Sequence, residues 1–206
     1  MMWRAVVCSS FLALVLPAQD FRNPDLPLDV RVADIVSRLT LAEKMSLMSS
    51  DQAAVPRLGI AARKVGSEAL HGVAYKTATV FPQAQGLGHT WDPDLIRQVG
   101  SAVGDEQRVY HNRDNYDLGL QIWSPVVDLA RDPRWGRTEE VYGEDPYLTS
   151  RIGGAYVRGL QGDDARYYKT IPTLKHFAAL ARPGRPSRPA CCRLSRPHWP
   201  IRADCR

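Results

Sequence analysis

Two of the three Asp-Pro pairs in this 206-residue chain constrain its fold more than any other feature. Asp92-Pro93 and Asp145-Pro146 each precede a stretch in which apolar residues recur every three or four positions. Asp is a favourable helix N-cap and Pro is favoured at the first helical position, so each pair predicts the start of a helix. We expect these helices to end near Tyr110 and just beyond Leu160, respectively.

Apolar runs predict strands around these helices. Residues 61–65, 118–127 and 173–179 form such runs, and they alternate with the helical stretches. This alternation is typical of a parallel sheet covered by helices. Because polar clusters follow the strands, we predict an α/β fold that is the N-terminal part of a (β/α)8 TIM-type barrel. Upstream, a capping box formed by Thr40 and Glu43 predicts a further helix.

The basic charge of the chain is concentrated in a C-terminal tail. The formal net charge is +5, but residues 181–206 hold seven arginines against the single acid Asp204. Without this tail 20 basic and 21 acidic residues remain, so the body is nearly neutral and we expect no nucleic-acid partner. We predict an unstructured Arg/Pro/Cys-rich tail. The alternative is a tail that binds nucleic acid or an anionic surface in a salt-dependent manner.

The first 18 residues have the pattern of an export signal. Arg4 supplies the positive charge, residues 5–16 supply an apolar run, and residues 16–18 supply a small-residue cleavage site. The run is too short to be a stable membrane anchor. We therefore predict a signal peptide at residues 1–18 and a secreted or periplasmic mature protein, with a buried first helix as the alternative.

The cysteines lie outside the predicted mature body. Cys8 is in the signal, and Cys191, Cys192 and Cys205 are in the tail, so the body has no disulfide framework and no thiol chemistry. The tail cysteines together with His198 do not match the spacing of a zinc site. We expect neither a metal nor a cofactor.

An arginine-rich loop follows the predicted strand 118–127. Residues 131–137 read Arg-Asp-Pro-Arg-Trp-Gly-Arg. A guanidinium makes forked hydrogen bonds to vicinal hydroxyls or a carboxylate, and an indole face can stack on a sugar. A solvated loop held by salt bridges is the alternative. For the acids that follow we expect structural roles: Asp145 caps a helix, Glu144 lies near the positive end of that helix, and Glu139 and Glu140 pair with nearby arginines. A carboxylate cluster for acid/base catalysis is the alternative.

Two further motifs carry polar side chains. Lys175 and His176 are neighbours on the last predicted strand, where successive side chains point to opposite faces. Both would therefore reach one site only at the end of the strand or where its backbone is distorted; a structural histidine is the alternative. Glu68 and His71 lie in Ser-Glu-Ala-Leu-His-Gly, and spacing alone makes them compatible with a helix start and no more.

Taken together, five segments resemble glycoside hydrolase family 3, the secreted β-glucosidases and β-xylosidases. They are FRNPDLPLDVRVADIVSRLTLAEKMSLM, SEALHGVA, TVFPQAQGLGHTWDPDLI, DPRWGRTEEVYGEDP and KHFAA, in this order from Phe21 to Ala179. The resemblance implies a retaining β-glycosidase that removes terminal sugars from plant-polysaccharide oligosaccharides or aryl glycosides. In such an enzyme an Asp nucleophile and an acid/base carboxyl lie about 5.5 Å apart, and no metal is needed.

The resemblance also implies sugar-binding roles. Arg137, Lys175 and His176 would hydrogen-bond the hydroxyls of the sugar in subsite −1, and Glu68 would do the same. Trp123 falls where an aromatic residue lines the sugar pocket of xylosidase-like members. The SEALHG form is more similar to the xylosidase branch than to glucosidases, many of which have Asp at the position of Glu68. Glucoside, xyloside and arabinoside nevertheless all stay open as substrates.

The chain departs from the family pattern after Ala179. Family members continue into more barrel and carry the nucleophile and the acid/base residue further on, whereas residues 181–206 resemble translation in a shifted reading frame. A complete barrel needs about 250 residues. We therefore expect residues 19–180 to form a partial barrel domain that is inactive by itself because the catalytic pair is missing. The alternative is a genuine truncated carbohydrate-binding protein that uses the same polar residues without chemistry.

Overall fold

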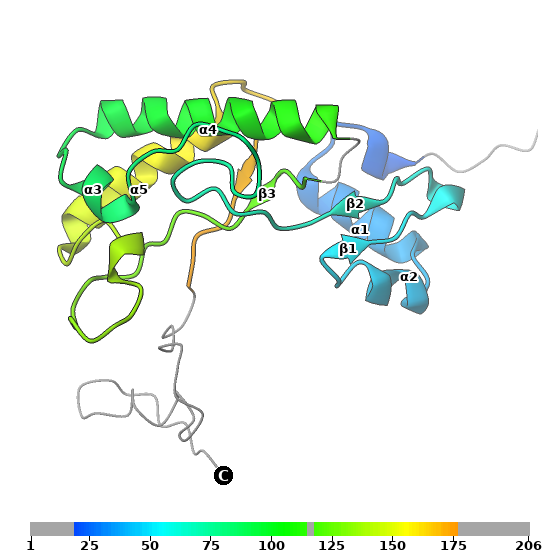
Figure 1. Ribbon diagram of the computed structural model, residues 1–206. Helices are drawn as coiled ribbons and strands as arrows, with labels where there is room; N and C mark the ends of the chain where they lie inside the picture. The colour runs from blue at the N-terminus through cyan, green and yellow to red at the C-terminus, as the bar shows by residue number, and fades with distance from the viewer. Residues whose placement is uncertain (1–18, 115–117, 177–206) are drawn as a thin grey trace, which may run out of the picture. The chain divides into compact units, whose positions relative to one another are not determined.

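The computed structural model describes residues 19–114 and 118–176 (Figure 1). These residues form two compact units that divide between Met48 and Ser49. The predicted signal peptide and the predicted tail lie outside the described residues. Within the described residues, no helix combines the length and apolar character needed to cross a bilayer.

The first unit consists of a short turn and two helices. They are a 3₁₀ turn at Asp20–Arg22, α1 at Leu28–Arg38 and α2 at Leu41–Ser46. Asp34 on α1 accepts the backbone N–H of Phe21 at 3.0 Å and pairs with Arg38 at 2.8 Å, which fixes the turn to the helix. The predicted capping box is confirmed: Thr40 caps α2 and accepts the N–H of Glu43, whose carboxylate accepts the N–H of Thr40 at 2.7 Å.

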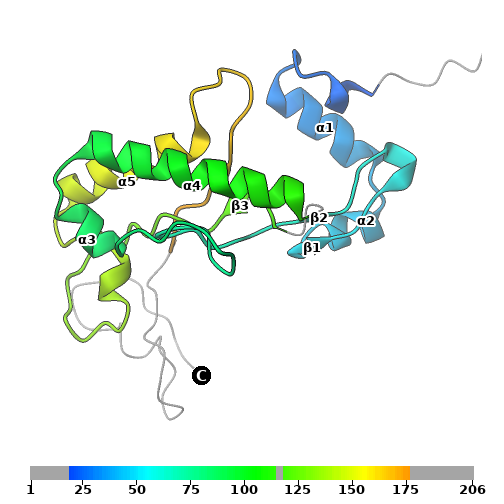
Figure 2. The same ribbon diagram turned by 45° about the horizontal axis from the view of Figure 1, so that its top comes forward.

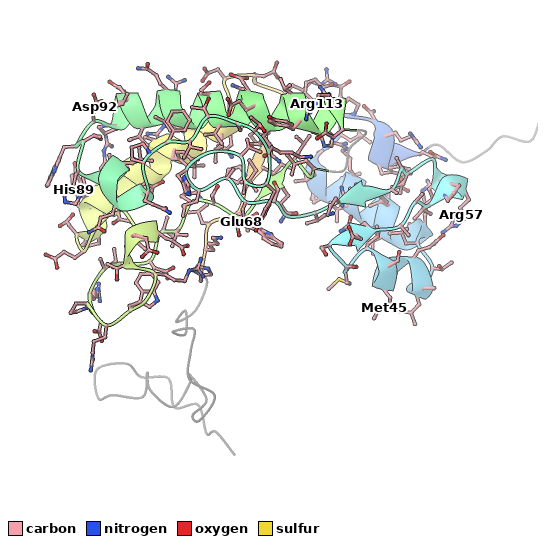
Figure 3. All side chains as sticks on the ribbon, in the orientation of Figure 1. Met45, Arg57, Glu68, His89, Asp92 and Arg113 are labelled. Carbon is pink, nitrogen blue, oxygen red and sulfur yellow. The ribbon has the colours of Figure 1, made fainter. Side chains whose placement is uncertain are left out.

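The second unit alternates strands and helices. Its elements are β1 at Asp51–Gln52, β2 at Arg63–Lys64, α3 at Ala84–Gly88, α4 at Pro93–Arg113, β3 at Gln121–Ile122, α5 at Pro146–Gln161 and β4 at Ile171–Pro172. Asp92 and Asp145 cap α4 and α5 through their carboxylates, as the two Asp-Pro pairs predict. Figure 3 labels Asp92 and Arg113 at the two ends of α4.

Three extended segments run parallel in the second unit. β3 pairs with β4, with Gln121 opposite Ile171. On the other side, Ser67 forms a parallel bridge with Ile122. Further along, Val126 and Lys175 form another parallel bridge. The order is thus the Ser67 segment, β3 and β4, with α4 connecting the first two and α5 connecting the last two, which confirms the predicted α/β alternation.

The strands differ from their predicted lengths. The run at 118–127 forms a two-residue ladder, β3. β4 ends at Pro172, before the predicted strand 173–179; of that strand the structure shows a single bridge at Lys175, and residues 177–179 lie outside the described residues. β2 pairs with β1 in an antiparallel hairpin that the sequence did not indicate. Ladder length depends on the partner segment, which an apolar run does not specify. The described residues show no closed barrel, so the α/β class is established and its completion as a barrel stays a prediction.

Helices α4 and α5 lie side by side (Figures 1 and 2). Their backbones approach closely at two glycines: a Cβ on Gly159 would lie 2.2 Å from the carbonyl oxygen of Arg97, and one on Gly100 would lie 2.5 Å from that of Tyr156. Only glycine fits such contacts. Around this crossing, Ile96, Val103, Ile122, Val126, Ile152 and Tyr156 form the centre of a continuous core.

Candidate functional site

The parallel segments place polar side chains at one edge of the sheet. Glu68, labelled in Figure 3, comes directly after the bridging residue Ser67. Asp128 comes two residues after Val126, and His176 directly follows Lys175. Because the segments run in the same direction, the residues at their carboxyl ends meet. The functional groups of α/β proteins gather at this edge.

Lys175 and Glu68 form the first contact of this cluster. The Lys175 Nζ donates to both carboxylate oxygens of Glu68, at 2.8 and 2.9 Å. The Lys175 side chain is 15% exposed and that of Glu68 is 33% exposed, so the pair is half-buried and one side of it is open to solvent. It joins residues 107 positions apart, which ties the first parallel segment to the last.

His176 is held by Asp128. One carboxylate oxygen, Oδ2, accepts both the backbone N–H of His176 at 3.2 Å and the ring Nδ1–H at 2.8 Å. The other ring nitrogen, Nε2, faces Arg137, whose Nη1 lies 3.4 Å away. Both Lys175 and His176 therefore reach the cluster, as expected for residues at the end of a strand, and the peptide bond between them is cis.

Arg137 is fixed by Glu140. Its Nε lies 2.5 Å from Glu140 Oε1, and its Nη2 donates to Oε2, which makes the pair bidentate. The 3₁₀ turn at Thr138–Glu140 brings the carboxylate back toward the guanidinium. Hydrogen bonds to Glu140 raise the pKa of Arg137 above its ordinary value, and the charges of Glu68 and Asp128 add to this effect. Arg137 is therefore a permanent cation within the cluster.

Trp123 packs against the segment that carries Glu68. Its indole covers Gly66, where a Cβ would come within 2.1 Å of the ring atom Cζ2. Its backbone N–H donates to the carbonyl of Ser67 at 2.8 Å. The ring therefore lies beside the first parallel segment, at Gly66, which precedes Glu68 by two residues. The role of Trp123 as a sugar-lining residue stays a prediction.

The rest of the arginine-rich loop is structural. Arg134 pairs with Asp132 at 2.7 Å on the exposed side of the loop. Trp135 packs against the hydrophobic core rather than standing free to stack on a sugar. The structural role of the following acids is confirmed for Glu140, which pairs with Arg137, and for Asp145, which caps α5. Of this loop, only Arg137 joins the cluster.

Asp128 is not among the residues predicted from the sequence. The available signal was its position as the first acid after the buried run Ser124–Val126, at the end of a predicted strand. The arginine-rich loop that follows carries a much denser set of polar residues. In the part of the chain that the structure describes, no group of three or more His, Cys, Asp and Glu is arranged to hold a metal ion.

The cluster is suited to bind a polyol. Lys175 has three donor hydrogens and Arg137 has five, and their carboxylate partners leave some of these free for a ligand. Carboxylate oxygens and the His176 ring supply acceptors, so hydroxyl groups find both partners within one half-buried edge. Such a cluster at the carboxyl ends of parallel segments is a candidate ligand-binding site.

The chain belongs to glycosyl hydrolase family 3: residues 31–184 match the N-terminal domain of that family. A xylan 1,4-β-xylosidase of Xylanibacter ruminicola is 44% identical over 173 residues, covering 79% of this chain and 20% of that protein. β-D-xylosidase 1 of Arabidopsis thaliana is 40% identical over 171 residues, covering 77% of this chain and 22% of that protein. The chain thus spans about a fifth of the length of these relatives.

Solved structures of the same family share the fold. A family 3 exo-β-xylosidase in complex with a xylobiose aziridine activity-based probe superposes with a TM-score of 0.67 at 34% identity, covering 75% of this chain and 21% of that chain. The β-glucosidase 3B of Thermotoga neapolitana in complex with α-D-glucose gives a TM-score of 0.59 at 27% identity, covering 72% of this chain and 23% of that chain.

Proposed function

We propose that this chain forms part of the sugar-binding half of a retaining β-glycosidase and that its polar cluster binds the terminal sugar of a β-linked oligosaccharide or aryl glycoside. The observation that carries the proposal is the meeting of Glu68, Arg137, Lys175 and His176 at one half-buried edge. These residues come from separate parts of the chain, and surface charges without a ligand have little reason to converge in this way.

A xyloside is the favoured substrate. The relatives named above include a xylan 1,4-β-xylosidase and a β-D-xylosidase, at 44% and 40% identity. Glu68 is consistent with this choice, because its sequence context resembles the xylosidase branch. A β-glucosidase is the second candidate, supported by the likeness to the Thermotoga enzyme.

The cluster's own carboxylates are suited to binding rather than to nucleophilic attack. Glu68 holds Lys175, Asp128 holds His176 and Glu140 holds Arg137. A retaining mechanism needs two further carboxyl groups about 5–5.5 Å apart across the scissile bond. We propose that segments corresponding to the unmatched four fifths of the relatives supply this pair in the working enzyme. The 206-residue chain alone is then a binding protein without turnover.

We further propose that the described segments are the start of a (β/α)8 barrel and that residues 1–18 direct export. The parallel order and the α/β crossovers support the first point. The charged, apolar and small-residue regions of the N-terminus support the second. N-terminal sequencing of protein recovered outside the producing cell tests export: a mature end near Gln19 is expected, and an intact Met1 would contradict it.

Calorimetric titration with xylobiose tests the sugar-binding proposal. Saturable binding is expected for the wild-type chain and for Lys64→Met, which removes an exposed lysine on β2. Lys175→Met should lose at least tenfold in affinity, because a charge-assisted hydrogen bond contributes about 1.5–3 kcal/mol. Equal affinities of the two variants would contradict the proposed site. In parallel, release of nitrophenol from an aryl xyloside above a blank would contradict the prediction of no turnover.

A further inference from the structure

Asp128 has an environment that the sugar-binding role of its neighbours does not account for. Its side chain is 21% exposed and contacts the ring of His176 at 2.8 Å. A single oxygen, Oδ2, accepts two hydrogen bonds, one from the backbone N–H and one from the ring of the same residue. Asp128 therefore fixes both the main chain and the ring orientation of His176.

The neighbours of the ring define its tautomer. An ionised carboxylate only accepts hydrogen bonds, so the 2.8 Å contact requires a proton on Nδ1 of His176. A guanidinium only donates, so the long contact from Arg137 at 3.4 Å favours a lone pair on Nε2. Both neighbours demand the same form of the ring, the neutral Nδ1–H tautomer. A proton on Nε2 would instead face the permanent charge of Arg137.

We propose that Asp128 is a positioning residue that holds His176 as the Nδ1–H tautomer and so keeps Nε2 as an acceptor for a sugar hydroxyl. The tautomer follows from the two contacts of the ring alone. The use of Nε2 by a sugar rests on the proposed function. The long contact to Arg137 leaves Nε2 weakly engaged, and a hydroxyl donor can compete for it on the half-buried edge.

Asp128 acts through geometry, as carboxylates do behind the imidazoles of other binding and catalytic sites. A carboxylate or carbonyl on one ring nitrogen decides which nitrogen of a histidine is presented to the ligand. Here the same oxygen also accepts the backbone N–H of His176, which fixes the carboxylate next to the ring, so that turning the ring breaks its hydrogen bond at Nδ1. Its loss should change the direction and the tautomer of the acceptor while leaving Arg137 paired with Glu140.

Nitrogen NMR of the histidine ring tests the tautomer in the wild-type chain. The 206-residue chain labelled with ¹⁵N-histidine is examined at about pH 8, with His176 assigned from the signals missing in His176→Gln. We expect one protonated nitrogen, Nδ1, and one unprotonated nitrogen, Nε2. A ring protonated at Nε2, or one that averages over both tautomers as in an unfolded chain, would overturn the proposal.

Asp128→Ala then tests whether Asp128 sets the tautomer of His176, with Asp132→Ala as the matched control. Asp132 is an acid four residues further along that pairs with the exposed Arg134. Asp128→Ala should populate the Nε2–H form of His176 and weaken xylobiose binding about tenfold. Asp132→Ala should leave both unchanged. Asp128→Leu, which keeps the branched shape but offers no acceptor, replaces the alanine variant if the latter does not fold.

The outcomes separate the two proposals. If xylobiose does not bind to the wild-type chain but His176 is Nδ1–H and is released from this form in Asp128→Ala, the proposed function fails and the positioning role stands. If xylobiose binds and the tautomer is unchanged by removal of Asp128, the positioning role fails and the proposed function stands.

Discussion

Replacement of tyrosine by phenylalanine should change the free energy of unfolding in opposite directions at two buried positions of the core. Tyr156 on α5 is 0% exposed and donates its hydroxyl to the carbonyl of Ala69 at 2.6 Å. Tyr142 is 1% exposed, and its hydroxyl has no hydrogen-bond partner among residues 19–114 and 118–176. Burial raises the pKa of both phenols, so both are neutral at ordinary pH. Because Ala69 follows Glu68, the Tyr156 bond also links α5 to the site.

The expected magnitudes follow from hydrogen bonding. Tyr156→Phe removes one buried hydrogen bond, while Ser124 still donates to Ala69 at 3.3 Å, so the free energy of unfolding should fall by about 1 kcal/mol. Tyr142→Phe removes a hydroxyl whose unpaired burial costs about 1–3 kcal/mol. This variant should therefore be as stable as the wild type or more stable. Neither substitution opens a cavity, because the ring is kept.

Urea unfolding followed by circular dichroism measures both effects on the 206-residue chain. The midpoint should fall for Tyr156→Phe and stay or rise for Tyr142→Phe, at an unchanged slope. For a chain of this size, 1 kcal/mol corresponds to about 2–4 °C in Tm. An equal loss of stability in the two variants would refute the reasoning, since it would mean that ring packing rather than hydrogen bonding decides the effect.

Further predictions concern backbone space and acid stability. Gly66→Ala should lower the free energy of unfolding by about 2 kcal/mol or more, because φ is +90° and the new Cβ would meet Trp123. Gly154→Ala on α5 has space for the new Cβ and should raise the free energy of unfolding by about 0.5–1 kcal/mol. Equal urea midpoints would contradict this pair. The pKa of Asp114 is lowered to about 2, chiefly by Arg113, so its contribution to stability is present above about pH 4 and is lost as the pH falls toward 2. Asp114→Asn should flatten the decline of Tm over this range, and an unchanged decline would contradict the assignment.

The parts of the fold that depend on local chemistry could be predicted from the sequence. Asp92 and Asp145 cap their helices, and Thr40 and Glu43 form their capping box, because these bonds join residues three positions apart or fewer. The α/β alternation also follows from the pattern. The hairpin of β1 and β2 and the short ladders do not, because they depend on which segments become neighbours.

The site residues likewise divide into those that could be predicted from the sequence and one that could not. Glu68, Arg137, Lys175 and His176 could be named from the family resemblance, and the structure brings them together. Asp128 could not, because its partner is 48 positions away and a single acid after an apolar run is equally compatible with a solvated loop or a helix cap. The contact between Asp128 and His176 forms only when β3 and β4 lie side by side.

The most direct test of the central claim is to map xylobiose on the folded chain by chemical-shift changes of assigned backbone and side-chain signals. If the cluster is the sugar-binding site, the largest saturable changes will fall on Glu68, Arg137, Lys175 and His176. Signals of the first unit, residues 19–48, will stay unchanged. Changes centred elsewhere, or no saturable change at millimolar xylobiose, would contradict the account.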